Sequence, residues 1–163
     1  MTFVRDIQDN AGGGIKSSLE LKKVLEAAEI TAREDQSGVF WCDYTPGSYD
    51  SIRIKLFFPM KSGILGVEGM LLGVEGQPTE DLRLAINYLN AEVPTYRFYV
   101  SEGDGALDSE IMVRHDLLPN LEAAPDIHPR ELRQIMTGLC AQKAIFAETL
   151  EQIQGGRSWR MVR

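Results

Sequence analysis

The segment from Leu107 to Leu117 gives the clearest strand pattern in this chain, because apolar and polar side chains alternate along it. A period of two gives a strand one buried face and one wet face, which is typical of an antiparallel sheet. Four further segments favour strands by their β-branched and aromatic content or by alternation: 39–45, 51–58, 63–76 and 96–100. The sequence therefore predicts a five-stranded antiparallel sheet.

The third of these segments is rich in glycine. The pentapeptide Leu-Gly-Val-Glu-Gly occurs at 65–69 and again at 72–76, and the stretch 63–76 holds five glycines. So many glycines disfavour a helix. The segment is predicted to be one strand that bends or bulges at glycine, or two short strands.

Three helices are indicated by their end signals and apolar stripes. Ser17 and Glu20 have the spacing of a capping box, and this first helix should fade near residues 30–33. Thr79 is a candidate N-cap of a second helix that ends near Asn90, and Pro129 opens a last, long helix. The predicted order is α-β-β-β-α-β-β-α, an α+β two-layer domain with the helices on one face of the sheet.

Composition and charge suggest how the chain is organised. Its 163 residues suit one domain, predicted at 17–154 between a flexible leader at 1–16 and a basic tail at 155–163. The tail holds Arg157, Arg160 and Arg163, whereas the whole chain has a net charge of −7. Such an acidic chain repels phosphate backbones, so we expect no nucleic-acid partner.

The residues that usually carry chemistry form no recognisable constellation. The two histidines, His115 and His128, lack a partner at metal-ligand spacing, and Cys42 and Cys140 are read as buried apolar residues. We expect no metal, no cofactor and no catalytic residue, and hence no enzyme. Because no run of about 18 apolar residues occurs, we expect no membrane partner and a cytoplasmic location.

One face of the predicted sheet offers a candidate contact patch. The strand phases place Phe57, Tyr99 and Met112 among charged residues on the face that the helices leave uncovered. Scattered exposed apolar side chains are the ordinary alternative for such a face. Trp159, between two arginines of the tail, is a further candidate for partner binding, either to this chain's own acidic surface or to a partner's.

The segment DLRLAINYLNAEVPTYRFYVSEGDGAL, at 81–107, resembles the YbjN family, whose members carry an N-x-x-N pair at the end of a helix before a strand. Here that pair is Asn87 and Asn90. The order of elements matches the family over 17–154, and the likeness is concentrated in 79–135. The resemblance implies a fold similar to type III secretion chaperones. Within it we expect Asn90 to adopt the left-handed conformation at the helix end and Asn87 to bond nearby backbone.

The resemblance also implies a kind of function. YbjN-like proteins are described as candidate sensory-transduction regulators without an established catalytic activity, and the related chaperones are homodimers that bind extended client segments. We therefore expect a non-enzymatic cytosolic regulator or chaperone-like module that binds a protein partner or client and forms a homodimer. The alternative is a small-ligand sensor with a pocket between sheet and helices, near the glycine-rich strand.

Overall fold

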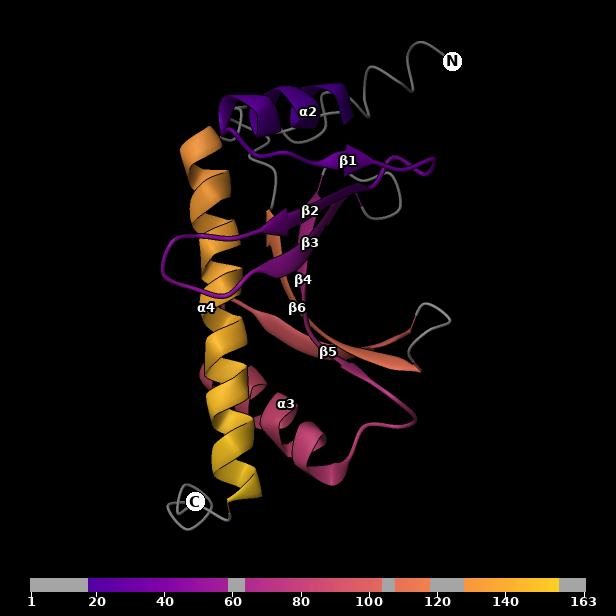
Figure 1. Cartoon of the computed structure of the whole chain (residues 1–163), viewed down its shortest axis with the longest axis vertical. Helices are drawn as coiled ribbons and strands as arrows, with labels where there is room; N and C mark the ends of the chain where they lie inside the picture. Colours follow the sequence, from indigo (N-terminus) through magenta and orange to yellow (C-terminus); the bar gives the residue numbers. More distant parts are fainter. Residues whose placement is uncertain (1–17, 59–63, 104–107, 118–127, 156–163) are drawn as a thin grey trace. The chain divides into compact units, whose positions relative to one another are not determined.

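The computed structural model describes residues 18–58, 64–103, 108–117 and 128–155. Ser17, the predicted leader and the tail beyond Gly155, which includes Trp159, lie outside the described residues. The described part is an α+β fold with three helices and an antiparallel sheet (Figure 1). The helices are α2 (Ser18–Ala27), α3 (Glu80–Glu92) and α4 (Pro129–Gln154), and the strands are β1 (Arg33–Glu34), β2 (Phe40–Tyr44), β3 (Ile52–Phe57), β4 (Leu65–Val74), β5 (Arg97–Glu102) and β6 (Ser109–Leu117).

The prediction of five strands is wrong, because the sheet has six, in the order β1-β2-β3-β4-β6-β5. The additional strand is β1, which pairs antiparallel with β2, so that the described elements run α-β-β-β-β-α-β-β-α. Its two residues, Arg33 and Glu34, are both charged and exposed, so they carry neither β propensity nor alternation. The other five predicted strands are all present, and the glycine-rich segment forms one continuous strand, β4.

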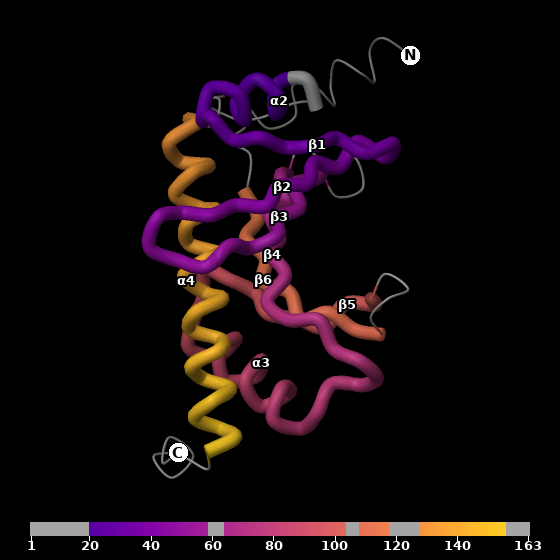
Figure 2. The backbone as a smooth tube through the Cα atoms, viewed as in Figure 1, coloured from indigo at the N-terminus to yellow at the C-terminus, as the bar shows by residue number. Residues whose placement is uncertain are grey.

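The hairpin loop between β1 and β2 explains why so short a strand forms. The Asp35 backbone N–H donates to the Val39 carbonyl at 2.9 Å, and Gly38 takes the positive φ of 83° that closes the reversal seen in Figure 2. The Asp35 carboxylate accepts the backbone N–H groups of Ser37 and Val39 at 2.8 and 3.1 Å. An aspartate that bonds its own loop in this way fixes a turn locally.

The chain divides into two compact units, and several elements run through both. Unit 1 comprises 1–44, 53–68 and 115–137; unit 2 comprises 45–52, 69–114 and 138–163. In unit 1, α2 lies alongside β1 (Figure 1), and the Arg133 side chain of α4 donates to the Ala28 carbonyl at the end of α2. The buried apolar residues of unit 1 come from α2 and the chain just after it, the strands and the first part of α4: Leu21, Leu25, Ala28, Ile30, Phe40, Cys42, Ile54, Leu56, Leu65, Val67, Leu132 and Met136.

Unit 2 is built on close approaches at glycine. A Cβ added to Gly69 would meet the Ile52 Cδ1 atom at 2.5 Å and Leu139 at 3.7 Å, so this glycine lets β4 pack directly against neighbouring side chains. A Cβ added to Gly138 of α4 would meet the Tyr96 hydroxyl in the same way. The apolar core of unit 2 draws on α3, α4 and four strands: Ile52, Leu71, Leu82, Ala85, Ile86, Leu89, Phe98, Ile111, Met112, Val113, Leu139, Cys140, Phe146 and Ile153.

The helix ends test the capping predictions. Thr79 is the N-cap of α3, and its hydroxyl accepts the Leu82 N–H at 3.3 Å, as predicted. The helix passes through Asn90 and ends at Glu92, with Val93 as its C-cap, so the expected left-handed conformation of Asn90 is wrong. The Asn90 side chain has a different role, which is to bond the backbone of Phe98 in β5.

Candidate functional site

The face of β2, β3 and β4 that points away from the core of unit 1 carries two aromatic rings and a lysine. Phe40 and Cys42 are buried in β2, and Ile54 and Leu56 in β3, so the residues between them point the other way. This alternation brings together four residues, which we call the outer-face cluster: Trp41, Lys55, Phe57 and Glu68.

Lys55 is the centre of this cluster. Its Nζ atom lies 4.7 Å from the ring centre of Phe57 and 5.8 Å from that of Trp41, within the range of cation–π attraction. The same atom lies 3.7 Å from the Glu68 carboxylate, and Glu68 is only 4% exposed. A buried carboxylate needs a nearby cation to offset its lost hydration, so Lys55 stabilises Glu68 and both rings at once.

Trp41 is fixed from its other end by the β1–β2 loop. Its indole N–H donates to the Asp35 carboxylate at 2.9 Å. Hydrogen bonds from Ser37 and then from Trp41 are the largest causes that lower the pKa of Asp35 well below its usual value. The carboxylate therefore stays ionised, and it holds the indole in one orientation at neutral pH.

The chemistry available to the cluster is that of contact. Its two rings are half-buried. An exposed ion pair between Asp43 of β2 and Arg53 of β3, at 3.0 Å, lies on the same strands as these rings. Partly exposed aromatic side chains beside charged neighbours are the composition found at protein interfaces, where Trp and Tyr are frequent anchors. The cluster holds no histidine, serine, threonine or cysteine.

The predicted contact residues are distributed over both units. Phe57 belongs to the outer-face cluster of unit 1. Tyr99 and Met112, in unit 2, are directly paired across β5 and β6 and thus share one face, as the strand phases predicted. Met112 is only 7% exposed, however, so it offers little surface to a partner. Trp159 lies outside the described residues, and its role stays a prediction.

Trp41 was missed as a site residue, although the sequence held a signal for it. Residues 39–45 were recognised as a strand, and alternation along that strand separates Trp41 from the buried Phe40 and Cys42. Pairing of that strand with its neighbour then puts Trp41 on the same side as Lys55 and Phe57. The contribution of Asp35 could not be read in this way, because it depends on the missed hairpin.

The remaining polar and thiol groups have structural surroundings. Cys42 and Cys140 are both buried, and burial raises the pKa of the Cys42 thiol to about 11. His128 accepts the Arg130 N–H at the start of α4, and His115 is half-buried in β6. Among the residues described, no three His, Cys, Asp or Glu side chains gather to hold a metal, and no helix is long and apolar enough to cross a membrane.

Comparison with known proteins gives a likeness of fold. No family model and no curated protein matches the sequence. The structure is similar to the crystal structure of YbjN from E. coli, a candidate transcription regulator, with a TM-score of 0.55 and 13% sequence identity over 86% of this chain and 93% of that chain. At that identity the likeness shows a shared fold, and it supports the expected resemblance at the level of the fold.

Proposed function

We propose that this chain is a non-enzymatic, cytosolic regulator or chaperone-like module. It forms a homodimer, and it binds protein partners through the outer-face cluster. The observation that carries this proposal is the half-exposed pair of rings, Trp41 and Phe57, held around the Lys55 amine. Because the Asp35 bond and the Glu68 ion pair fix the cluster beforehand, little side-chain entropy is lost when a partner covers it.

The likeness of fold is in keeping with a regulatory role. The structural neighbour is named as a candidate transcription regulator. Homodimerisation and the binding of extended client segments come from the resemblance of the sequence to the YbjN family and its chaperone-like fold. The acidic charge of the chain, −7, favours a protein partner over nucleic acid.

The small-ligand alternative was expected near the glycine-rich strand. At Gly69 that place is filled by Ile52 and Leu139, so the described residues offer no observation in its favour there.

The proposal is tested by affinity capture from the native host with a double variant and a matched control. Trp41→Ser with Phe57→Ser removes both rings, and we expect it to abolish capture of the proteins that wild type retains. The control is Tyr49→Ser, which removes an exposed ring, 38% exposed, from the β2–β3 loop. If the double variant folds by circular dichroism and captures the same proteins as the control, the outer-face cluster is not the binding surface.

The mass of the free protein tests the homodimer separately from partner capture. Light scattering over a range of concentrations reports whether wild type is a dimer. A monomer at every concentration would remove the homodimer from the proposal and leave partner capture to be judged separately.

A further inference from the structure

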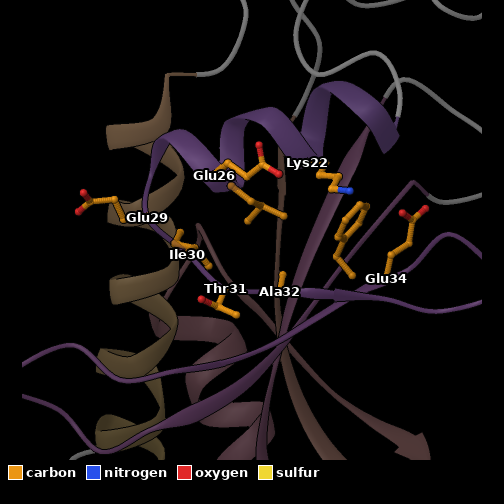
Figure 3. A pocket seen from close by; sticks show the side chains of 9 residues that line it. Lys22, Glu26, Glu29, Ile30, Thr31, Ala32 and Glu34 are labelled. Carbon is orange, nitrogen blue, oxygen red and sulfur yellow. The ribbon is translucent and has the colours of Figure 1, made fainter.

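An open groove of about 630 Å³ lies in unit 1 between α2 and the edge strand β1. Its walls are α2 on one side and the chain from Glu29 to Glu34 on the other, with Phe40 of β2 also lining it. Figure 3 shows Lys22 and Glu34 at one end of the groove and Glu29, Ile30 and Thr31 at the other. The groove is separate from the outer-face cluster, with which it shares no residue.

The backbone along this groove is positioned to accept another strand. β1 ends the sheet order, so only β2 pairs with it. The Asp35 N–H donates to the Val39 carbonyl, so the backbone groups of Asp35 face β2. Along an antiparallel strand the backbone groups of successive residues face opposite sides, so the N–H and C=O groups of Ala32 and Glu34 point away from β2. Ala32 and Glu34 both line the groove, and within the described part of the chain no strand pairs with them on that side.

The rim of the groove is acidic. Glu26, Glu29 and Glu34 are exposed there, against one lysine, Lys22. Glu29 has a φ of 60°, the left-handed conformation that ends α2, and this fixes where its backbone lies. A groove of this charge attracts an extended segment that carries arginine and lacks acid.

The chain itself contains such a segment. Residues 157–163 read RSWRMVR, with three arginines, Trp159 and no acid, and they follow the glycine pair that ends α4. We propose that the groove between α2 and β1 binds residues 157–163 of a second copy, which adds as a strand to the edge of β1. The proposal rests on the homodimer of the proposed function and names the segment that joins the two copies.

The lengths and chemistry are compatible. Seven extended residues span about 23 Å, whereas the exposed edge at residues 31–34 spans about 13 Å, so the segment covers the whole edge. Main-chain bonds to Ala32 and Glu34 give affinity, and arginines beside the acidic rim give selectivity, which is the usual division in strand addition.

A charge swap between two full-length variants tests the contact. The groove variant is Glu26→Lys with Glu34→Lys, and the tail variant is Arg157→Glu, Arg160→Glu and Arg163→Glu. Each variant alone should dimerise at least tenfold more weakly than wild type by light scattering, because groove and tail then carry like charges. An equimolar mixture should recover association, because the basic groove of one chain meets the acidic tail of the other.

The control for added charge is Glu148→Lys with Glu151→Lys, two exposed acids of α4 outside the groove, which should dimerise as wild type does. A tail variant that dimerises like wild type, with an unchanged circular dichroism spectrum, would overturn the tail contact while leaving the homodimer in place. A mixture that stays monomeric, when both variants are folded, would overturn it too. A monomeric wild type would remove the tail contact and the homodimer together.

Strand addition itself is tested without a change of charge. Ala32→Pro removes an N–H that points away from β2, so the hairpin keeps its ladder and the added strand loses a donor. We expect dimerisation at least tenfold weaker than in Ala32→Val, which keeps the N–H. Equal dimerisation of the two variants would show that the segment does not bind as a strand.

Discussion

The two edges of the sheet end in different ways. At the β5 edge, the Asn90 side chain of α3 takes both outward groups of Phe98: the Phe98 N–H donates to Oδ1 at 2.7 Å, and Nδ2 donates to the Phe98 carbonyl at 2.8 Å. At the β1 edge, α2 lies alongside, but within the described residues Ala32 and Glu34 keep their outward groups in an acidic groove. One amide side chain therefore does at Phe98 what a neighbouring strand would do, and nothing equivalent is described at β1.

If the tail binds at β1 as proposed, a helix beside an edge does not by itself protect it. Exposed edges invite pairing with other chains, and proteins limit this by covering, charging or shortening the edge. At β5 a specific pair of hydrogen bonds occupies the backbone of Phe98, whereas β1 is short and charged. Occupied backbone groups cannot pair with any added strand, whereas a charged groove selects among strands by their charge.

Asn90→Ala should have the largest effect, since it makes the β5 edge resemble the β1 edge. Two hydrogen bonds at about 1 kcal/mol each are lost, so the free energy of unfolding should fall by about 2 kcal/mol in urea denaturation. The freed Phe98 groups should also increase aggregation, measured by light scattering on heating.

Asn87→Ala is the matched control, because Asn87 is the other asparagine of the N-x-x-N pair and is exposed on the same helix. It should change stability by less than about 0.5 kcal/mol, as surface substitutions usually do. Equal losses for the two variants would mean that the Asn90 pairing does not close the edge.

The sequence predicted the parts of this contrast that depend on local pattern. The strand at β6, the Thr79 cap and the shared face of Tyr99 and Met112 follow from spacing along the chain, and the structure has them. Burial along β6 does not alternate strictly, because Met112 is buried between Ile111 and Val113. Asn90 was recognised by its position in a motif but was assigned the wrong role. A side chain that bonds a strand eight residues later leaves no periodic signal in the sequence. Asparagine often takes the left-handed conformation at a helix end, so its position near the end of the helix favoured that prediction.

The β1 edge was missed for a related reason. Its two residues have no pattern of their own, and the strand exists because the loop around Asp35 closes on it. Likewise, Met112 shares a face with Tyr99 as predicted, but its 7% exposure depends on how the rest of the fold covers it. The alternation along a strand determines which way a side chain points, whereas tertiary packing decides whether that side chain is exposed to a partner.

Glu29→Gly probes the β1 side of this contrast, because it changes the wall of the β1 groove without touching β1. A residue other than glycine in the left-handed conformation costs about 1 kcal/mol, so relief at φ 60° should raise the free energy of unfolding by about 0.5–1 kcal/mol. Glu29→Gln, which removes the charge but keeps the strained conformation, should leave stability nearly unchanged. A similar gain from glutamine would attribute the effect to charge instead of backbone.

Asp35→Asn should have the smallest effect and acts on the β1 edge through its loop. Asparagine keeps a carbonyl acceptor but loses the negative charge that favours the bonds from Ser37 and Trp41. The pKa of Asp35 is lowered in the folded state, so its contribution is present at a pH above the unfolded value of about 3.9 and is lost as the pH falls through the folded value. Wild type should therefore have a higher Tm than the variant at pH 7, and the difference in Tm between the two proteins should shrink as the pH falls below about 4. Since the carboxylate is exposed, solvent screens it and the gap stays small. A gap that persists unchanged down to pH 2 would show that the ionised carboxylate does not hold the hairpin, and the order of β1 would then have to come from its pairing with β2 alone.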